Sequence, residues 1–439
     1  MSKIVVSNSG PLRGSVSTGG SKNAVLPLLA ATLLTDETCV LDGVPDLKDV
    51  EVMCRLLRSF GAEVEQDAAG RRIAVTAGRI ATCEAPPDLA KAMRASVVAM
   101  GPLLARCGEA TIPLPGGCAI GDRPIDLHVK GFLALGADVE ILTDESGAGC
   151  VRATAGRPAG TEMYLDFASV GATENIMMAA VLTPGTTVIE NPAQEPEIVD
   201  LANFLNKMGA RIRGAGTDAI RIEGVQALHG AEHSVIPDRI EAATFMLAAA
   251  ITRGDVLVEN MLPNHVVPVI AKLRECGVRI REEDAGLRVD GTAGGFRATD
   301  IKTLPYPGFP TDIQPQFMAF LATANGPSNI VETVFENRFL HIEELNRMGA
   351  GILAEGRRAI VRGGAHLHGA AVRATDLRAG AALVLAGLVA DGETTVADVY
   401  HIDRGYEDLV GKLEGLGADI RRMKNGGPQD SVDRRVFAE

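Results

Sequence analysis

The sequence predicts an α/β fold assembled from six copies of one supersecondary unit. Six helix-like stretches end alike, in an apolar residue, a glycine and a short strand-like segment, as in LLRSFGAEVE and KLEGLGADIR. The glycines lie 75, 73, 68, 72 and 68 residues apart along the chain, at Gly61, Gly136, Gly209, Gly277, Gly349 and Gly417. A segment that recurs at a nearly constant period indicates one structural unit used repeatedly.

The third copy shows the elements of the unit most clearly. Residues 169–185 have a serine start and a glycine stop around an apolar helix pattern, and TTVIEN (186–191) is typical of a strand. Residues 195–209 carry apolar side chains at helical spacing, and ARIRG and AIRIEG flank a short turn, which predicts a hairpin. Each unit is therefore expected to contribute two helices and about three strands, in the order α-β-α-β-β.

Composition excludes several classes of protein. The chain has 439 residues, of which 46% are hydrophobic, and a mean hydropathy of +0.13, so two or three domains with large cores are possible. No apolar run approaches the roughly 20 residues that span a bilayer, and MSKIVVSNSG lacks the apolar stretch of a signal peptide. Seven cysteines without CxxC spacing predict a reducing cytoplasmic setting rather than disulfides or a zinc site. A net charge of −13 gives no sign of nucleic-acid binding, and the polar residues 425–439 predict a flexible tail.

Two loop positions recur in every unit: the start of the first helix, and the link from the strand to the second helix. In parallel βαβ arrangements such loops lie at one edge of the sheet and hold ligands. The notable residues at helix starts are Lys22, Asn23, Arg94, Ser169, Val170, Gly171, Asp238, Arg239, Asp312 and Arg378. Those at the links are Cys118, Arg123, Arg338 and Arg404.

The cations at these loops predict an anionic ligand. A positive side chain beside a helix N-terminus opposes the helix dipole at a cost of roughly 0.3–1 kcal/mol, whereas the N–H groups there attract anions. The planar guanidinium of Arg also matches the oxygens of phosphate and carboxylate. For any single cation, the sequence leaves open the alternative of a solvated surface residue.

The segment PGGCAIGDRP (115–124) is the most specific local motif. Its glycines permit tight turns, and a guanidinium such as that of Arg123 lowers the pKa of a nearby thiol and favours the thiolate. We therefore interpret Cys118 as reactive. The remaining cysteines are interpreted as small buried hydrophobic residues: Cys39, Cys54, Cys83, Cys107, Cys150 and Cys276.

Asp312, in FPTD, allows two interpretations. Its carboxylate is typical of a helix N-cap, and a carboxylate that faces a cationic cleft can also act as a general base. The sequence leaves both roles open.

Beyond these patterns, nine segments resemble one known family. They are SKNAVLPLLAATLL, MRAS, PGGCAIGDRPIDLH, SVGATENIMMAA, EPEIVDLANFL, FPTD, TVFENRF, DLRAGAALVLAG and HIDRGYE. In this order they are similar to the UDP-N-acetylglucosamine enolpyruvyl transferases, and the resemblance spans about residues 3–424. It implies a two-domain inside-out α/β barrel with six βαβαββ-type repeats, three per domain. The implied domains are residues 21–235 and residues 1–20 plus 236–424, with chain crossings near residues 20–21 and 234–237.

The resemblance also implies a reaction. The enolpyruvyl group of phosphoenolpyruvate would pass to the 3′-hydroxyl of UDP-N-acetylglucosamine with release of phosphate, the first committed step of peptidoglycan synthesis. No metal or organic cofactor is implied. The alternatives that stay open are the shikimate-pathway enolpyruvyl transferase and a non-catalytic sugar-nucleotide sensor, and the oligomeric state is open too.

Residue roles follow from the same resemblance. Lys22, Arg94, Arg123 and Arg404 would hold phosphoenolpyruvate, supported by Arg338 and Arg378. Cys118 would donate a proton and form a covalent adduct, and Asp312 would accept the proton of the sugar hydroxyl. Asn23 and Val334 would contact the amino sugar. The UDP moiety would be held by Arg123, Pro124, Ile125, Asp126, Leu127, Ser169, Val170 and Gly171. Some relatives carry a lysine where this chain has Phe167, which places more of the UDP phosphate binding on Arg94 and Arg123.

Overall fold

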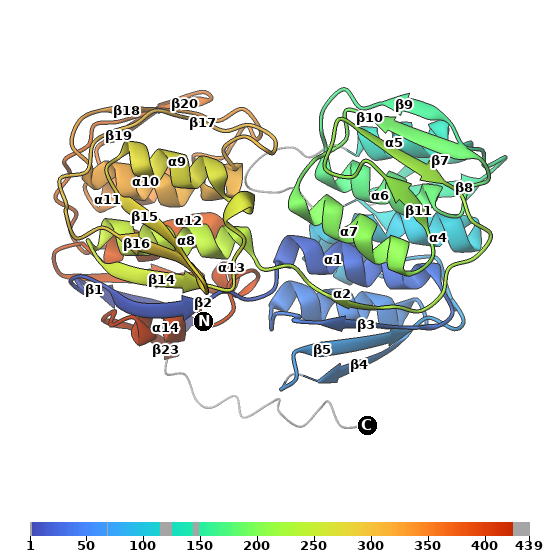
Figure 1. Ribbon diagram of the computed structural model, residues 1–439, viewed down its shortest axis with the longest axis horizontal. Helices are drawn as coiled ribbons and strands as arrows, with labels where there is room; N and C mark the ends of the chain where they lie inside the picture. The colour runs from blue at the N-terminus through green and yellow to red at the C-terminus, as the bar shows by residue number, and fades with distance from the viewer. Residues whose placement is uncertain (1, 68, 115–124, 144–148, 425–439) are drawn as a thin grey trace.

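The chain forms two hydrophobic cores. A computed structural model describes residues 2–67, 69–114, 125–143 and 149–424; the predicted tail, 425–439, lies outside this part. One core is built from residues between Ala24 and Val235, and the other from residues between Ile4 and Val16 together with those between Ile240 and Ile420. Figure 1 shows the resulting halves side by side. We call the half that contains α1 to α7 the first half and the other the second half.

The strands of the first half form three small sheets within the described residues. They are β3 (Thr38–Asp42), β4 (Glu63–Asp67), β5 (Arg72–Thr76), β6 (Glu109–Pro113), β7 (Ala137–Thr143), β8 (Gly149–Ala155), β9 (Glu162–Tyr164), β10 (Thr186–Glu190), β11 (Arg211–Arg213), β12 (Ala219–Glu223) and β13 (Glu232–Ser234). The strand orders are β13-β3-β5-β4, β6-β8-β7 and β11-β12-β10-β9.

The second half repeats this plan with three sheets of four strands in the described part. Its strands are β1 (Ser2–Ser7), β2 (Arg13–Ser17), β14 (Asp255–Glu259), β15 (Arg279–Glu283), β16 (Gly286–Asp290), β17 (Ile301–Lys302), β18 (Ser328–Val331), β19 (Ile352–Glu355), β20 (Arg358–Val361), β21 (Ala371–Arg373), β22 (Glu393–Ala397) and β23 (Ile420–Lys424). The orders are β15-β16-β14-β2, β17-β18-β20-β19 and β21-β22-β1-β23. The last sheet is completed by the N-terminal strand β1, which pairs antiparallel with both β22 and β23.

Helices fill the interior of each half. The first half has α1 (Lys22–Ala31), α2 (Lys48–Ser59), α3 (Pro87–Ala92), α4 (Met100–Cys107), α5 (Asp126–Ala134), α6 (Val170–Ala180) and α7 (Pro196–Lys207), with 3₁₀ turns η1 (Thr32–Leu34) and η2 (Arg94–Ala99). The second has α8 (Arg239–Ile251), α9 (Val267–Glu275), α10 (Gln314–Thr323), α11 (His341–Arg347), α12 (Leu377–Gly387), α13 (Tyr400–Asp403) and α14 (Leu409–Gly415), with η3 (Pro263–His265) and η4 (Thr311–Ile313).

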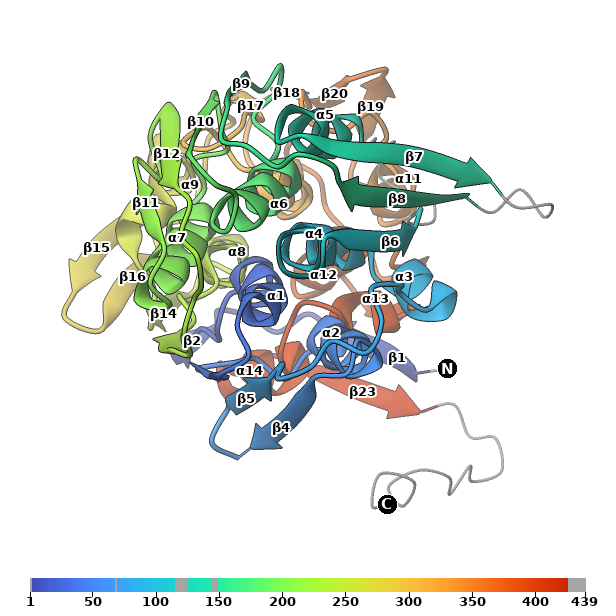
Figure 2. The same cartoon turned by 90° about the vertical axis from the view of Figure 1, so that its right-hand side faces the viewer.

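The first helix of each unit is mostly apolar, and this places it inside. In α8 every residue from Ile240 to Ile251 is buried, and α10 and α12 pack against it. A helix without a polar face must be buried on all sides, so the sheets lie outside and the helices inside. In the first half, α1, α4 and α6 are the first helices of their units, and most of their residues are buried. Figure 2 shows these three helices near the middle of this half. This arrangement confirms the predicted fold class. Among the described residues, no helix is both long and apolar enough to span a membrane.

The recurring glycines have a common backbone role. All six follow the second helix of a unit, and all have positive φ, from 86° at Gly136 to 102° at Gly61. Glycine is the residue that adopts this conformation without strain, and it therefore ends the helix and starts the hairpin. One boundary differs from the prediction: α6 ends at Ala180 rather than at Gly185. Pro184 disfavours helix at the residue before it, which accounts for the earlier end.

The two halves are joined where the chain crosses twice. At the first crossing, the chain leaves β2, which pairs with β14 in the second half, and enters α1 in the first half. At the second crossing, it leaves β13, which pairs with β3 in the first half, and enters α8 in the second half. Both crossings run next to each other, since Gly20 and Pro237 form an antiparallel bridge and Ser21 N–H donates to Ile236 O at 2.7 Å. Gly20 is required there, because a Cβ atom would lie 2.1 Å from Gly43 O.

Candidate active site

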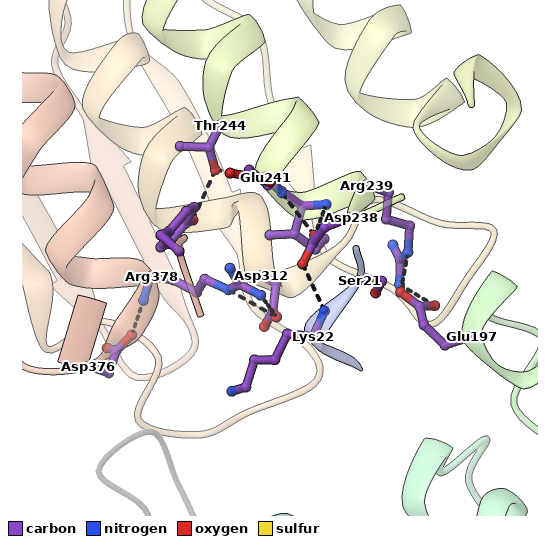
Figure 3. Close-up of polar contacts among 12 residues, drawn as sticks. Ser21, Lys22, Glu197, Asp238, Arg239, Glu241, Thr244, Asp312, Asp376 and Arg378 are labelled. Carbon is purple, nitrogen blue, oxygen red and sulfur yellow. Dashed lines mark hydrogen bonds and ion pairs between the residues drawn. The ribbon is translucent and has the colours of Figure 1, made fainter. Parts of the chain in front are cut away.

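Lys22 lies at the first crossing, as the first residue of α1. The Ser21 side chain accepts from Ala24 N–H at 3.3 Å and caps the helix, and Asp238 of the other crossing accepts from Lys22 N–H at 3.2 Å. Figure 3 shows the Lys22 side chain in the same region as Asp312 and Arg378. Burial lowers the pKa of Lys22; Asp49 opposes this effect, while Arg378 and Arg404 add to it.

Asp49 joins Lys22 to Arg404 and thereby links the two halves. Its carboxylate, 4% exposed, accepts from Lys22 Nζ at 2.9 Å, and from Arg404 Nε at 2.8 Å and Nη2 at 3.3 Å. Burial would raise the pKa of Asp49, but the two cations outweigh it and hold the pKa below its usual value. We call Lys22, Asp49 and Arg404 the Asp49 cluster.

Sequence reasoning missed Asp49. An acidic residue in the first turn of an amphipathic helix needs no further explanation, because it stabilises the helix dipole. A signal was nevertheless present in the repeat. Asp49 lies 12 residues before Gly61, just after a strand-to-helix link, as Arg338 lies 11 residues before Gly349 and Arg404 lies 13 before Gly417.

Asp312 is bound by two arginines of the second half. Its Oδ1 accepts from Arg338 Nη2 at 3.0 Å, and its Oδ2 accepts from Arg378 Nε at 3.1 Å and Nη2 at 3.0 Å. Neither η4 nor α10 has a side-chain cap. The N-cap interpretation of Asp312 is therefore wrong, because its carboxylate points to guanidinium groups instead of the helix N–H groups. We call Asp312, Arg338 and Arg378 the Asp312 cluster.

The arginines of the Asp312 cluster are almost completely buried. Arg378 is the second residue of α12, whose N-cap is Asp376. Its guanidinium lies over the ring of Tyr406, 5.3 Å from the ring centroid. Burial disfavours its charge, yet Tyr406 and Asp312 hold the pKa of Arg378 above its usual value. Arg338 Nε and Nη1 and Arg378 Nη1 are buried and have no hydrogen-bond partner in the part of the chain that the structure describes. Since an unpaired buried N–H is costly, these groups favour a further acceptor at this position.

Those residues expected to bind UDP that the structure describes lie in the first half. Ser169 caps α6 by accepting from Ala172 N–H at 3.4 Å, and Val170 and Gly171 open that helix. The backbone of Gly171 lies against His128 of α5, since a Cβ at Gly171 would lie 3.3 Å from His128 Cε1. Burial, and to a lesser extent Arg94, lowers the pKa of His128 to about 4.

The same region contains the other expected UDP contacts that are described. Arg94 begins η2 and is partly buried, Ile125 is buried just before α5, Asp126 is exposed and Leu127 is partly buried. Of the two expected amino-sugar contacts, Asn23 is partly exposed in α1, and Val334 lies in the segment between β18 and α11 that also carries Arg338. Cys118, Arg123 and Pro124 lie outside the described residues.

The six described cysteines are free, and only three of them are buried as predicted. Cys39, Cys54 and Cys276 are buried, and burial raises the pKa of Cys54 to about 11 and that of Cys276 to about 12. Cys83 and Cys150 are only partly buried, and Cys107 is exposed, so the interpretation of Cys107 as a buried residue is wrong. Cys107 is the last residue of α4, where Gly108 turns the chain out of the helix. Within the described chain, no group of three or more His, Cys, Asp or Glu residues could hold a metal ion.

Comparisons with known proteins agree with this architecture. Residues 6–413 match the family EPSP synthase (3-phosphoshikimate 1-carboxyvinyltransferase). The crystal structure of the enolpyruvyl transferase NikO from Streptomyces tendae has a TM-score of 0.86 at 27% identity and covers 96% of this chain and 98% of its own. EPSP synthase from Acinetobacter baumannii shares the fold, with a TM-score of 0.72 at 19% identity over 97% of this chain and 100% of its own. The chain therefore belongs to the EPSP synthase family, whose solved members include enolpyruvyl transferases.

Within that family, the chain is similar over nearly its full length to proteins of one name. UDP-N-acetylglucosamine 1-carboxyvinyltransferase 1 of Caldanaerobacter subterraneus subsp. tengcongensis is 60% identical, over 96% of this chain and 99% of the relative. UDP-N-acetylglucosamine 1-carboxyvinyltransferase 2 of Carboxydothermus hydrogenoformans is 57% identical, over 97% of this chain and 100% of the relative. The resemblance inferred from the sequence motifs is thereby confirmed.

Proposed function

We propose that this protein transfers the enolpyruvyl group of phosphoenolpyruvate to the 3′-hydroxyl of UDP-N-acetylglucosamine and releases phosphate, the first committed step of peptidoglycan synthesis. The observation that carries the proposal is the site itself. Lys22 and Arg404 share Asp49, and Arg338 and Arg378 share Asp312, although these residues are spread between positions 22 and 404. The names of the relatives that are 57–60% identical support the choice of acceptor.

The two clusters fit the two chemical tasks of this reaction. Lys22 and Arg404, with Arg94 and Arg123, would bind the phosphate and carboxylate of phosphoenolpyruvate, because guanidinium and ammonium groups pair with these oxygens. Asp312 is 26% exposed and its orientation is fixed by Arg338 and Arg378, so it is suited to accept the proton of the sugar hydroxyl.

The bond changes balance with these residues alone. The sugar oxygen O3′ bonds to C2 of phosphoenolpyruvate while Asp312 takes its proton and Cys118 protonates C3, which gives a tetrahedral ketal that carries phosphate and carboxylate. The C2–O bond to phosphate then breaks, C3 returns a proton to the Cys118 thiolate, and the leaving phosphate takes the proton held by Asp312, which leaves the enolpyruvyl ether. A dense set of cations stabilises the charge of the ketal best when water is excluded.

The test is phosphate release from phosphoenolpyruvate, measured alone, with UDP-N-acetylglucosamine and with shikimate 3-phosphate. We expect release only with the sugar nucleotide, and its loss in Cys118→Ala. Release only with shikimate 3-phosphate would instead support the shikimate-pathway reaction. Tight binding of the sugar nucleotide without any release would support the sensor.

We further propose that the halves are domains, residues 21–235 and residues 1–20 plus 236–424, that close over both substrates in the cytoplasm. The separate cores, the adjacent crossings and the Asp49–Arg404 ion pair between the halves support this division. Closure would exclude water from the cationic site. Protease protection that appears only when both substrates are added would support it.

Cys118 also gives a prediction about inhibition. We expect the epoxide fosfomycin to alkylate Cys118, because a thiolate is a strong nucleophile. Intact-mass analysis should show one adduct on the unmodified protein and none on Cys118→Ser. An adduct that persists in Cys118→Ser would contradict this assignment.

A further inference from the structure

Glu332 is a buried carboxylate that the proposed reaction does not use. It follows β18 directly and is 1% exposed. Its Oε1 accepts from Thr303 Oγ1 at 2.7 Å, Val334 N at 2.9 Å and Phe335 N at 3.3 Å, and its Oε2 accepts from Thr311 Oγ1 at 2.9 Å. All four donors are neutral, so the buried charge is stabilised by oriented dipoles.

Three of these donors, Thr311, Val334 and Phe335, belong to the two segments that meet at the Asp312 cluster. Thr311 directly precedes Asp312, whose Oδ1 accepts from Arg338 at 3.0 Å. Val334 and Phe335 begin the segment that leads to Arg338. Two interactions therefore connect the two segments: the ion pair of Asp312 with Arg338, and the hydrogen bond from Thr311 to Glu332.

A third contact fixes Glu332 itself. Thr303 Oγ1 donates to Glu332 and accepts from Thr333 N–H at 2.9 Å, and Thr333 Oγ1 donates to Thr303 O at 2.6 Å. Thr303 is completely buried. The carboxylate of Glu332 is thus held on the β17 side. Within the described residues, the Thr311 hydroxyl makes its one side-chain hydrogen bond to the η4 segment that carries Asp312.

We propose that Glu332 is a positioning residue. Through Thr311 it fixes the position of the Asp312 carboxylate. Through the Val334 and Phe335 amides it fixes the position of the segment expected to contact the amino sugar. The inference rests on the proposed function. When a catalytic base is displaced by a fraction of an ångström, the turnover rate falls while the affinity of the enzyme for its substrate is kept. Glu332 therefore acts on turnover through Asp312 and on acceptor binding through Val334.

Thr311 offers the sharpest test, because its hydroxyl can be removed or kept at nearly constant shape. We expect Thr311→Val to lower kcat about 10- to 100-fold, the effect of one hydrogen bond to a charged group, and to change the KM for UDP-N-acetylglucosamine little. Thr311→Ser keeps the hydroxyl and should restore kcat to within about twofold. Thr323→Val is the matched control, since Thr323 Oγ1 donates to Phe320 O at 2.8 Å further along the helix that follows Asp312.

The Glu332→Gln variant tests whether the position or the charge of the Glu332 side chain determines the rate. The amide oxygen can take the place of Oε1, and the Thr311 hydroxyl can rotate to accept from the amide nitrogen, so the geometry is kept while the charge is lost. We expect a decrease in kcat of less than about fivefold, smaller than that of Thr311→Val. A larger loss in Glu332→Gln than in Thr311→Val would overturn the positioning role in favour of a direct electrostatic one.

The remaining outcomes separate this inference from the proposed function. If the unmodified protein turns over UDP-N-acetylglucosamine but Thr311→Val and Thr323→Val have the same kcat, the inference alone is overturned. If the unmodified protein releases no phosphate with this acceptor, the proposed function fails, and the inference with it.

Discussion

Two carboxylates in this molecule are each bound by two cations, and their surroundings are opposite. In the Asp49 cluster the carboxylate is 4% exposed, while the side chains of Lys22 and Arg404 are 13% and 33% exposed. In the Asp312 cluster the arginines are 2% exposed and the carboxylate is 26% exposed. The first cluster therefore presents cations to its surroundings, and the second presents a carboxylate.

The clusters also differ in which halves supply them. Asp49 and Lys22 come from the first half and Arg404 from the second, whereas Asp312, Arg338 and Arg378 all come from the second half. Movement of the halves would make or break the first cluster but would leave the second intact. This difference suggests that an anion site is completed on closure, whereas the base is oriented in advance.

Asp312→Asn should have the largest effect, because it removes the carboxylate that the second cluster presents. We expect turnover to fall about 10²- to 10⁴-fold, the usual contribution of a general base, while affinity for the sugar nucleotide is largely kept. Phosphate release and calorimetric titration measure the two quantities. Asp88→Asn, at an exposed position in the first turn of α3, is the control. Equal loss in both variants would remove the distinction between the clusters.

Asp49→Asn should have a smaller effect of a different kind. Asp49 competes with any anionic ligand for Lys22 and Arg404, so its neutralisation should leave affinity for phosphoenolpyruvate unchanged or higher. Turnover should nevertheless fall about 10- to 100-fold, since the two cations lose the buried negative charge and one of the two acceptor oxygens that orient them, a loss of roughly 1–3 kcal/mol. Titration with phosphoenolpyruvate and initial rates test the two parts. A parallel loss of affinity and rate would mean that Asp49 supports the anion site rather than competing with it.

The sequence predicted the second cluster better than the first, for a physical reason. Asp312, Arg338 and Arg378 stand at unit-specific loop positions where their residue types are unusual, so the repeat alone marked them. Asp49 looked ordinary because a first-turn carboxylate stabilises any helix. Its role depends on Lys22, which precedes it by 27 residues, and on Arg404, which follows it by 355 residues.

Backbone features were the easiest to predict, because they depend on local chemistry. The six glycines were assigned as helix ends, and each has the positive φ that such an end requires. The burial of Cys107 was predicted wrongly because exposure depends on where α4 leaves the core, which the local sequence does not specify. Similarly, the N-cap interpretation of Asp312 failed because two distant arginines bind its carboxylate more strongly than helix N–H groups.

The pH dependence of the free energy of unfolding should show the smallest effect, and it compares the two clusters through their histidines. Each cluster has a histidine beside its arginine. His341, near Arg338, is completely buried and neither ring nitrogen has a partner in the described residues, whereas His401, near Arg404, is partly exposed. Burial lowers the pKa of His341 to about 4, with Asp376 opposing this effect and Arg338 adding to it. Burial and Arg404 also lower the pKa of His401.

The sign of the pH effect follows from these pKa values. The unfolded chain protonates its histidines near pH 6.5, while folded His341 remains neutral down to about pH 4. Between these values the unfolded state binds more protons, so the free energy of unfolding falls as the pH is lowered. His341→Leu should flatten this dependence by up to about 1.4 kcal/mol per pH unit, and His401→Leu by less. Urea unfolding at about pH 7.5 and about pH 5 measures both slopes, and an equal change in the two variants would show that burial does not distinguish the clusters.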